Sequence, residues 1–251
     1  HVPTTEEAVT FEECAAEHVR RMQSVQPHGP YRIAGYSSGG MLAYEMARQL
    51  AERGEQTEFL GFIDAGVPPA FERRFVGSRK QKAAALARNL PLMVRELRAK
   101  SFADRWRKIL GFVSRGMRKL TARCRPAAAS RQAESDWLAC FAEDISFFPD
   151  ERLSQIKRHY EAVKRYEPGD WQGSAELFRV ARQPLSAVPT PTLGWEHLVR
   201  GDVGVHGVTG THDSLMQPPH VDQLAQTIDA ALDRCDAASA TVSELCVVAE
   251  A

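Results

Sequence analysis

The chain has 251 residues, of which 43% are hydrophobic, enough apolar material for one large domain or for a domain with an inserted subdomain. This composition excludes a collagen-like, disordered or miniature protein. Basic and acidic residues number 32 each, so the net charge is zero and no overall field attracts nucleic acid or a membrane surface.

The five cysteines are odd in number, widely spaced and contain no Cys-x-x-Cys pair. Neither a disulfide framework nor a zinc site is therefore indicated, and a reducing cytoplasm is the expected location. No stretch approaches the about 18 consecutive apolar residues of a membrane helix. The start of the chain has no signal-peptide pattern. Because it begins with His1 and not with an initiator Met, the chain is expected to be a piece of a longer protein.

The first 69 residues alternate helical and strand patterns. Thr10 and Glu13 have the spacing of a capping box, which predicts the start of the first helix. The periodicity then predicts a helix at 11–24, a strand at 31–34, a helix that closes near Gly54 and a strand at 59–63. Strands that alternate with helices indicate a parallel sheet.

Residues 70–165 carry long helical patterns with few strand signals, which predicts an all-helical insertion. Its charge is uneven, because residues 72–131 contain 18 basic and three acidic side chains, a balance of +15. One interpretation is a set of solvated amphipathic helices whose long basic stems cover apolar surface; the other is a basic binding surface. A nucleic-acid surface is not expected, since the few aromatic residues there fit helix-core spacing.

The alternation resumes after the insertion, with strands predicted at 175–180 and 203–208 and a last helix opened by Pro218-Pro219. The remaining segment, 236–251, is rich in Ala, Ser and Thr and is expected to be a flexible tail. The expected organisation is a core built from residues 1–69 and 166–235, a basic helical lid at 70–165, and the tail.

The sequence Gly35-Tyr36-Ser37-Ser38-Gly39-Gly40 lies between a predicted strand and a predicted helix. This context is typical of a nucleophile elbow, in which a serine stands at the apex of a sharp strand-to-helix turn. Gly35 and Gly39 are expected to be required by packing, because strand and helix nearly touch there. Ser37 is therefore the candidate nucleophile.

A serine hydroxyl needs a base, and the base needs an orienting acid. His212 follows the strand at 203–208 and precedes the last helix, and the other seven histidines are less well placed. Asp64 ends the strand at 59–63, 27 residues after Ser37, whereas residues 181–185, directly after the strand at 175–180, include no carboxylate. Asp202 and Asp213 are expected to face solvent or cap turns. No metal constellation and no phosphate loop is present in the sequence, so the expected chemistry needs no metal and no bound cofactor.

With this elbow, an acid 27 residues on, a helical insert and Gly-Thr-His-Asp-Ser-Leu-Met before the last helix, residues 3 to about 232 resemble the thioesterase domains that end nonribosomal peptide synthetases and polyketide synthases. The resemblance implies an α/β-hydrolase fold with a mainly parallel sheet and a helical lid. It implies that Ser37 takes an acyl chain from the phosphopantetheine thioester of a carrier protein, that His212 and Asp64 activate Ser37, and that water or an internal nucleophile releases the product.

One departure concerns the oxyanion hole. The family has strands before the first helix, and a loop there supplies one of two oxyanion donors, so the native domain is expected to be larger than this chain. The backbone N–H of Ser38 can supply the other donor. If the basic lid steers an acidic carrier protein, Arg105, Arg107 and Lys108 are candidate contacts for it. An editing thioesterase and a non-catalytic carrier-binding module are the alternative functions.

Overall fold

The computed structural model describes residues 10–68, 71, 87, 89–91, 94, 98, 150–181 and 190–249. The chain divides into two units, one formed by His1–Leu86 with Arg158–Ala251 and the other by Ala87–Lys157. In the second unit the described residues are helical. Arg105, Arg107, Lys108 and most of the predicted lid lie outside the described residues.

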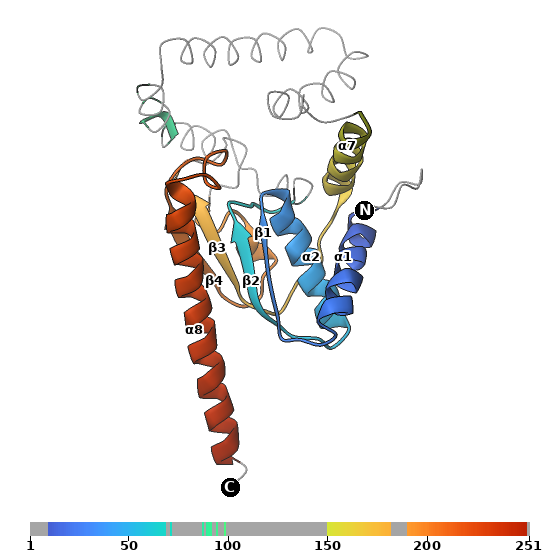
Figure 1. The fold of residues 1–251 in the computed structure, drawn as a ribbon, viewed down its shortest axis with the longest axis vertical. Coiled ribbons are helices and arrows are strands. Elements are labelled where there is room, and N and C mark those ends of the chain that lie inside the picture. The colour runs from blue at the N-terminus through green and yellow to red at the C-terminus, as the bar shows by residue number, and fades with distance from the viewer. Residues whose placement is uncertain are drawn as a thin grey trace. The chain divides into compact units, whose positions relative to one another are not determined.

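The helices and strands follow one another in an alternating order in the first unit (Figure 1). They are α1 (Phe11–Val25), β1 (Tyr31–Tyr36), α2 (Ser38–Glu52), β2 (Thr57–Ile63), the end of α7 (Asp150–Arg165), β3 (Ala175–Val180), the short 3-10 helix η1 (Trp195–His197), β4 (Val203–Val208) and α8 (His220–Ala249). No helix in the described part of the chain is long and apolar enough to cross a membrane.

The four strands of the described residues form one sheet in the order β1-β2-β3-β4, and every neighbouring pair is parallel. Successive side chains of a strand point to opposite faces, so β2 supplies two apolar clusters. Leu60 and Phe62 pack in the cluster that includes residues of α1 and α2, whereas Phe59 and Ile63 pack with residues of α8. Figure 1 shows the corresponding layers, with α1 and α2 on one side of the sheet and α8 on the other. The fold is therefore α/β with a parallel sheet, as the sequence predicts.

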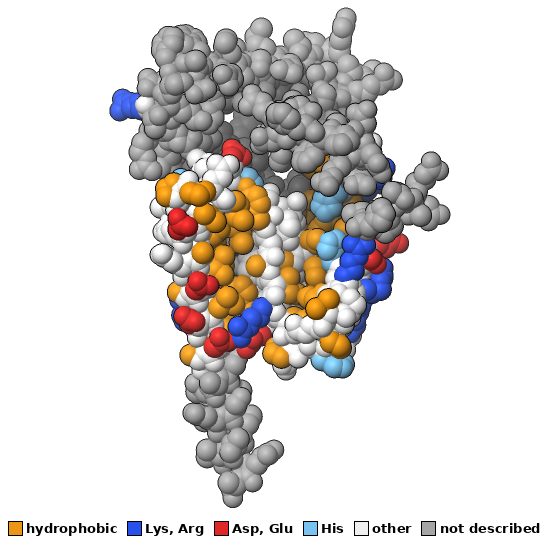
Figure 2. All heavy atoms as spheres, in the orientation of Figure 1, with side chains coloured by type: hydrophobic (Ala, Val, Ile, Leu, Met, Phe, Trp, Pro, Cys, Tyr) orange, Lys and Arg blue, Asp and Glu red, His pale blue; other side chains and the backbone are white. Residues whose placement is uncertain are grey.

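The amino ends and the carboxyl ends of the parallel strands lie on opposite sides of the sheet. Near the amino ends of the strands, Arg32 donates to Glu58 at 2.8 Å and also pairs with Asp236 of α8. In the view of Figure 2, hydrophobic side chains gather over the middle of the described core, and charged side chains lie around them along both sides and at the lower end. The carboxyl ends of parallel strands meet at the opposite edge, where loops are free to present functional groups.

Local sequence signals explain how the elements begin and end. Both halves of the predicted capping box are present, because the N–H of Glu13 donates to Thr10 Oγ1 at 3.1 Å and the N–H of Thr10 donates to the Glu13 carboxylate at 2.8 Å. The sequence predicts a loose tail after Cys235, whereas in the structure α8 continues through this segment to Ala249. That segment has no Gly or Pro and is rich in Ala, which has the highest helix propensity.

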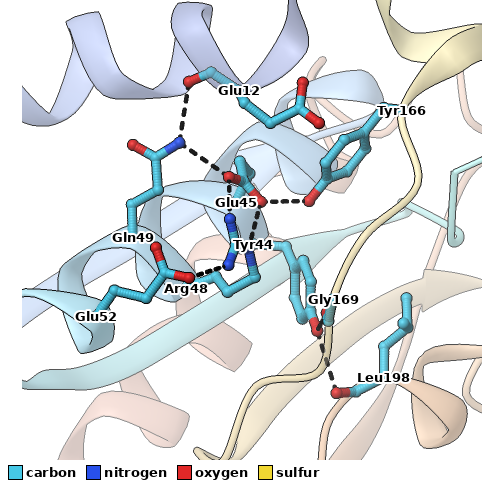
Figure 3. Close-up of polar contacts among 9 residues, drawn as sticks. All are labelled: Glu12, Tyr44, Glu45, Arg48, Gln49, Glu52, Tyr166, Gly169 and Leu198. Atoms are coloured by element: carbon cyan, nitrogen blue, oxygen red, sulfur yellow. Dashed lines mark hydrogen bonds and ion pairs between the residues drawn. The ribbon is translucent and has the colours of Figure 1, made fainter.

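A buried polar network joins α1, α2 and the segment after α7 (Figure 3). The fully buried carboxylate of Glu45 accepts from Tyr166 Oη at 2.6 Å, from Arg48 at 2.8 and 2.9 Å, and from Gln49 at 2.8 Å. Gln49 also donates to the carbonyl of Glu12 at 2.9 Å. Burial opposes ionisation, but the hydrogen bonds from Arg48, Tyr166 and Gln49 outweigh burial and hold the pKa of Glu45 below its usual range.

Candidate active site

Ser37 occupies the sharp turn between β1 and α2. Its φ of 55° and ψ of −125° are rare for a residue with a side chain, and such strain is typical of functional positions. Neighbouring elements hold the turn, because the N–H of Ser37 donates to the carbonyl of Ile63 at 3.0 Å and its carbonyl accepts from Gly40 at 3.1 Å. The strand-to-helix geometry predicted for the elbow is therefore present.

The glycines of the elbow do not all have the predicted role. A Cβ added at Gly35 would lie 2.0 Å from the carbonyl oxygen of Gly39, so a side chain is excluded at Gly35. At Gly39 itself an added Cβ meets nothing within 4 Å, and the prediction that packing requires this glycine is wrong. The second position that excludes a side chain is Gly40, whose added Cβ would lie 2.4 Å from Cβ of Ala65. Gly35 lies close to the backbone of Gly39, whereas the space beside the Gly39 Cα is open.

Asp64 follows β2 directly and is held from two sides. Its backbone adopts a φ of 46°, and its N–H donates to the carbonyl of Phe178 at 2.7 Å. One carboxylate oxygen accepts from the N–H of Val180 at 3.1 Å, and the other lies 2.8 Å from Nδ1 of His212. The side chain is only 2% exposed. A buried carboxylate that is held through its backbone and through one of its oxygens is a rigid acceptor for the imidazole at the other oxygen.

His212 lies in the turn after β4 and contacts both other candidates. Its Nε2 is 3.0 Å from Oγ of Ser37, and its Nδ1 is 2.8 Å from the Asp64 carboxylate. An ionised carboxylate only accepts hydrogen bonds, so Nδ1 carries the proton and Nε2 is left as the acceptor for the serine hydroxyl. The structure thus brings together three side chains that the sequence separates by 27 and 148 positions. This arrangement suits removal of the proton from Ser37.

The structure also places Tyr36 at this site, which the sequence reasoning missed. Its hydroxyl donates to the backbone carbonyl of His212, and its ring stacks on the imidazole at a centroid distance of 4.9 Å. Burial, followed by the charges of Asp213 and Asp64, raises the pKa of Tyr36 to about 12, so the phenol remains a donor at neutral pH. The only sequence signal was its position directly before the candidate nucleophile.

The remaining candidate residues lie as follows. Ser38 is the first residue of α2, where a backbone N–H has no acceptor within its own helix. Asp213 is exposed, and the backbone of Asp202 bonds to Ala175 and Ser174 before β4. His206, inside β4, contacts Glu176 and stacks on Phe178. Among the described residues, no group of three or more His, Cys, Asp or Glu side chains is arranged to hold a metal ion.

Known proteins are similar to this chain in sequence or in fold. An orsellinic acid synthase of Emericella nidulans is 25% identical over 240 residues, which cover 88% of this chain and 10% of that protein. AB3403, a four-domain nonribosomal peptide synthetase whose crystal structure holds AMP and glycine, is 22% identical, and the match covers 91% of this chain and 16% of AB3403 with a TM-score of 0.55. This chain therefore spans a small part of either synthase.

The fold of this chain is also similar to that of a thioesterase domain whose structure was solved by itself. The NocB thioesterase domain, in covalent complex with a fluorophosphonate nocardicin G analogue, matches with a TM-score of 0.54 and 18% identity over 91% of this chain and 77% of that domain. These likenesses establish the α/β-hydrolase fold of thioesterase domains. Residues 3–232 match the family described as the thioesterase domain, and the chain belongs to that family.

Proposed function

We propose that this domain releases an acyl, peptidyl or polyketide chain from the phosphopantetheine thioester of a carrier protein, with Ser37 as nucleophile, His212 as base and Asp64 as the orienting acid. The observation that carries the proposal is the continuous contact from Ser37 Oγ through His212 to Asp64, at 3.0 and 2.8 Å. Membership of the thioesterase domain family supports the same reaction class. The similarity to multidomain synthases supports a carrier protein as the partner that presents the substrate.

In the first half of the reaction, Nε2 of His212 accepts the proton of Ser37 while Oγ attacks the thioester carbonyl. The C–S bond then breaks, the acyl group stays on Ser37, and the thiol of the pantetheine arm leaves with the proton from His212. Asp64 stabilises the imidazolium that exists between these two proton transfers. The N–H of Ser38 is proposed as one donor to the oxyanion, since it lies at the start of α2, where the helix dipole is positive.

In the second half, His212 removes a proton from water or from a hydroxyl or amine of the acyl chain itself. That oxygen or nitrogen attacks the ester carbonyl, the bond to Ser37 Oγ breaks, and His212 returns the proton to the serine. Water gives an acid, and an internal nucleophile gives a ring. No bound cofactor or metal takes part in this proposed sequence. Arg105, Arg107 and Lys108 remain candidate contacts for an acidic carrier protein.

A fluorophosphonate tests the proposal without any assumption about the acyl chain, because it reacts with an activated serine. The purified chain and its Ser37→Ala variant are treated with the probe, and intact mass and peptide mapping locate the adduct. We expect one adduct on Ser37 and none in the variant. A folded chain that gains no adduct, or a variant that gains the same adduct, refutes the assignment and favours a non-catalytic carrier-binding domain. Hydrolysis of acyl-pantetheine substrates by the labelled and unlabelled protein then tests the thioesterase reaction.

A further inference from the structure

Two independent contacts join Tyr36 to His212 across 176 positions of sequence. The phenol hydroxyl donates to the main-chain carbonyl of His212. The Tyr36 ring also lies on the imidazole face, with a centroid distance of 4.9 Å and an interplanar angle of 23°. One residue thus contacts both the backbone and the ring of the candidate base.

His212 needs such support because burial does not fix it. Its side chain is 38% exposed, whereas that of Asp64 is 2% exposed. The hydrogen bonds to Asp64 and Ser37 constrain Nδ1 and Nε2, but they leave the plane of the ring free to turn about the line that joins these two atoms. A contact on the ring face removes that freedom.

The turn that carries His212 is held by hydrogen bonds within itself and by bonds between Thr209 and the start of α8. Thr211 and Ser214 exchange hydrogen bonds, with the N–H of Thr211 3.0 Å from Ser214 Oγ and the N–H of Ser214 3.1 Å from the Thr211 carbonyl. These bonds shape the turn but do not fix its distance from Ser37. Tyr36 can fix it, because Tyr36 is the last residue of β1 and directly precedes Ser37.

We propose that Tyr36 is a positioning residue that holds the His212 imidazole within hydrogen-bond distance of Ser37 through its hydroxyl and its ring. This inference rests on the proposed roles of Ser37 and His212. It assigns a function to the residue directly before Ser37, and it separates two contributions: the hydrogen bond fixes the backbone of the His212 turn, and the stacked ring fixes the imidazole plane.

The test uses Tyr36→Phe, which keeps the ring and removes the hydroxyl, and Tyr36→Leu, which removes both. The concentration dependence of fluorophosphonate labelling gives the maximal rate kinact and the half-saturating concentration KI. We expect kinact to fall about threefold to tenfold in Tyr36→Phe, which corresponds to the free energy of one lost hydrogen bond. In Tyr36→Leu we expect kinact to fall about 100-fold, which is the effect expected when a catalytic base is displaced by about 1 Å. KI should stay within about twofold of the parent value in both variants, because a positioning residue changes the reaction and not the encounter.

A matched control comes from the same strand. Tyr31 also donates its hydroxyl to backbone carbonyls, those of Gln26 and Pro27, but its ring has no contact with His212 in the described structure. Tyr31→Phe should therefore leave kinact unchanged. A comparable fall in both Phe variants would show that loss of any β1 hydroxyl slows labelling through the fold, and it would overturn the proposal.

A double-mutant cycle with His212→Ala gives the decisive readout. If Tyr36 acts through His212, then Tyr36→Leu has no further effect on the slow residual labelling of His212→Ala. An equal loss in both backgrounds refutes the proposal, because it means that Tyr36 supports Ser37 or the fold directly. Labelling of Tyr36→Leu at the parent rate refutes it as well. Failure of the parent chain to label instead contradicts the proposed function, so the two failures are distinguishable.

Discussion

Replacement of Gly35 by alanine should disrupt the elbow far more than the same replacement four residues later. The new Cβ would lie 2.0 Å from the Gly39 oxygen, 2.1 Å from the Gly39 carbonyl carbon and 2.5 Å from the Gly40 nitrogen. All three are backbone atoms at the start of α2, so no side chain can rotate away. Since real Cβ atoms essentially never approach within 3.0 Å, β1 and α2 must separate by at least about 1 Å.

The cost follows from that displacement. Overpacking a well-packed interior costs about 1–3 kcal/mol and sometimes more, and a clash between two backbones belongs at the upper end. We therefore expect Gly35→Ala to lower the free energy of unfolding by about 3 kcal/mol. Because Ser37 lies between Gly35 and α2, a shift of about 1 Å should also slow fluorophosphonate labelling by about 100-fold.

Gly39→Ala is the matched control. Its Cβ meets nothing within 4 Å, and alanine favours a helix over glycine by up to about 1 kcal/mol. This variant should be as stable as the parent or slightly more so, and it should label at the parent rate. Urea unfolding followed by circular dichroism measures the stabilities, and intact mass measures the labelling. Equal destabilisation by the two alanines would refute the reasoning, because it would show that the backbone contact at Gly35 does not decide the fold of the elbow.

Further predictions concern the buried network, the first helix and the orienting acid. Tyr166→Phe removes a hydrogen bond to the ionised Glu45 and should lower the unfolding free energy by about 1.5–3 kcal/mol, whereas Tyr44→Phe removes bonds to neutral carbonyls and should cost about 1 kcal/mol; denaturant unfolding compares them. The pKa of Glu45 is depressed in the fold, so its stabilisation is complete above the unfolded pKa of about 4.3 and is lost as the pH falls through the folded pKa. The Tyr166→Phe difference should accordingly be full at neutral pH and shrink in titrations below about pH 4, and a constant difference would contradict an ionised Glu45. Thr10→Ala removes the capping box and should cost about 1 kcal/mol, measured by thermal unfolding. Asp64→Asn should reduce kinact for the fluorophosphonate by about 10⁴-fold with an unchanged fold, and near-parent labelling would exclude Asp64 as the orienting acid.

Most of the sheet and the elbow could be predicted from local patterns. The strands at 175–180 and 203–208 have the predicted bounds, because each is a short apolar-rich run between turn signals. β1 extends two residues beyond the predicted strand, since pairing with β2 continues to Tyr36. Periodicity reports side-chain burial, whereas the length of a strand also depends on its partner.

Other features depend on contacts that no local pattern contains. A side chain is excluded at Gly40 but not at Gly39, because Ala65 lies beside Gly40. Ala65 follows β2 and lies beside α2 only in the folded chain. The role proposed for Tyr36 depends on its contacts with His212, which the parallel pairing of the four described strands brings beside it. A motif names the residues that the local turn requires, but long-range packing decides which neighbours the turn contacts.

The position of the acid shows how the sheet makes this arrangement possible. Asp64 stands at the end of β2, between the ends of β1 and β3, so its backbone and carboxylate both bond to the end of β3 at Phe178 and Val180. The other carboxylate oxygen, Oδ2, contacts His212, which lies beyond the end of β4. Ser37, which contacts the same histidine, lies at the end of β1. All four parallel strands end at the same edge, and each end supplies either one of the three side chains or the backbone that holds the acid. Since Asp64 already accepts the hydrogen bond of His212 Nδ1, the histidine needs no second carboxylate from the segment after Val180.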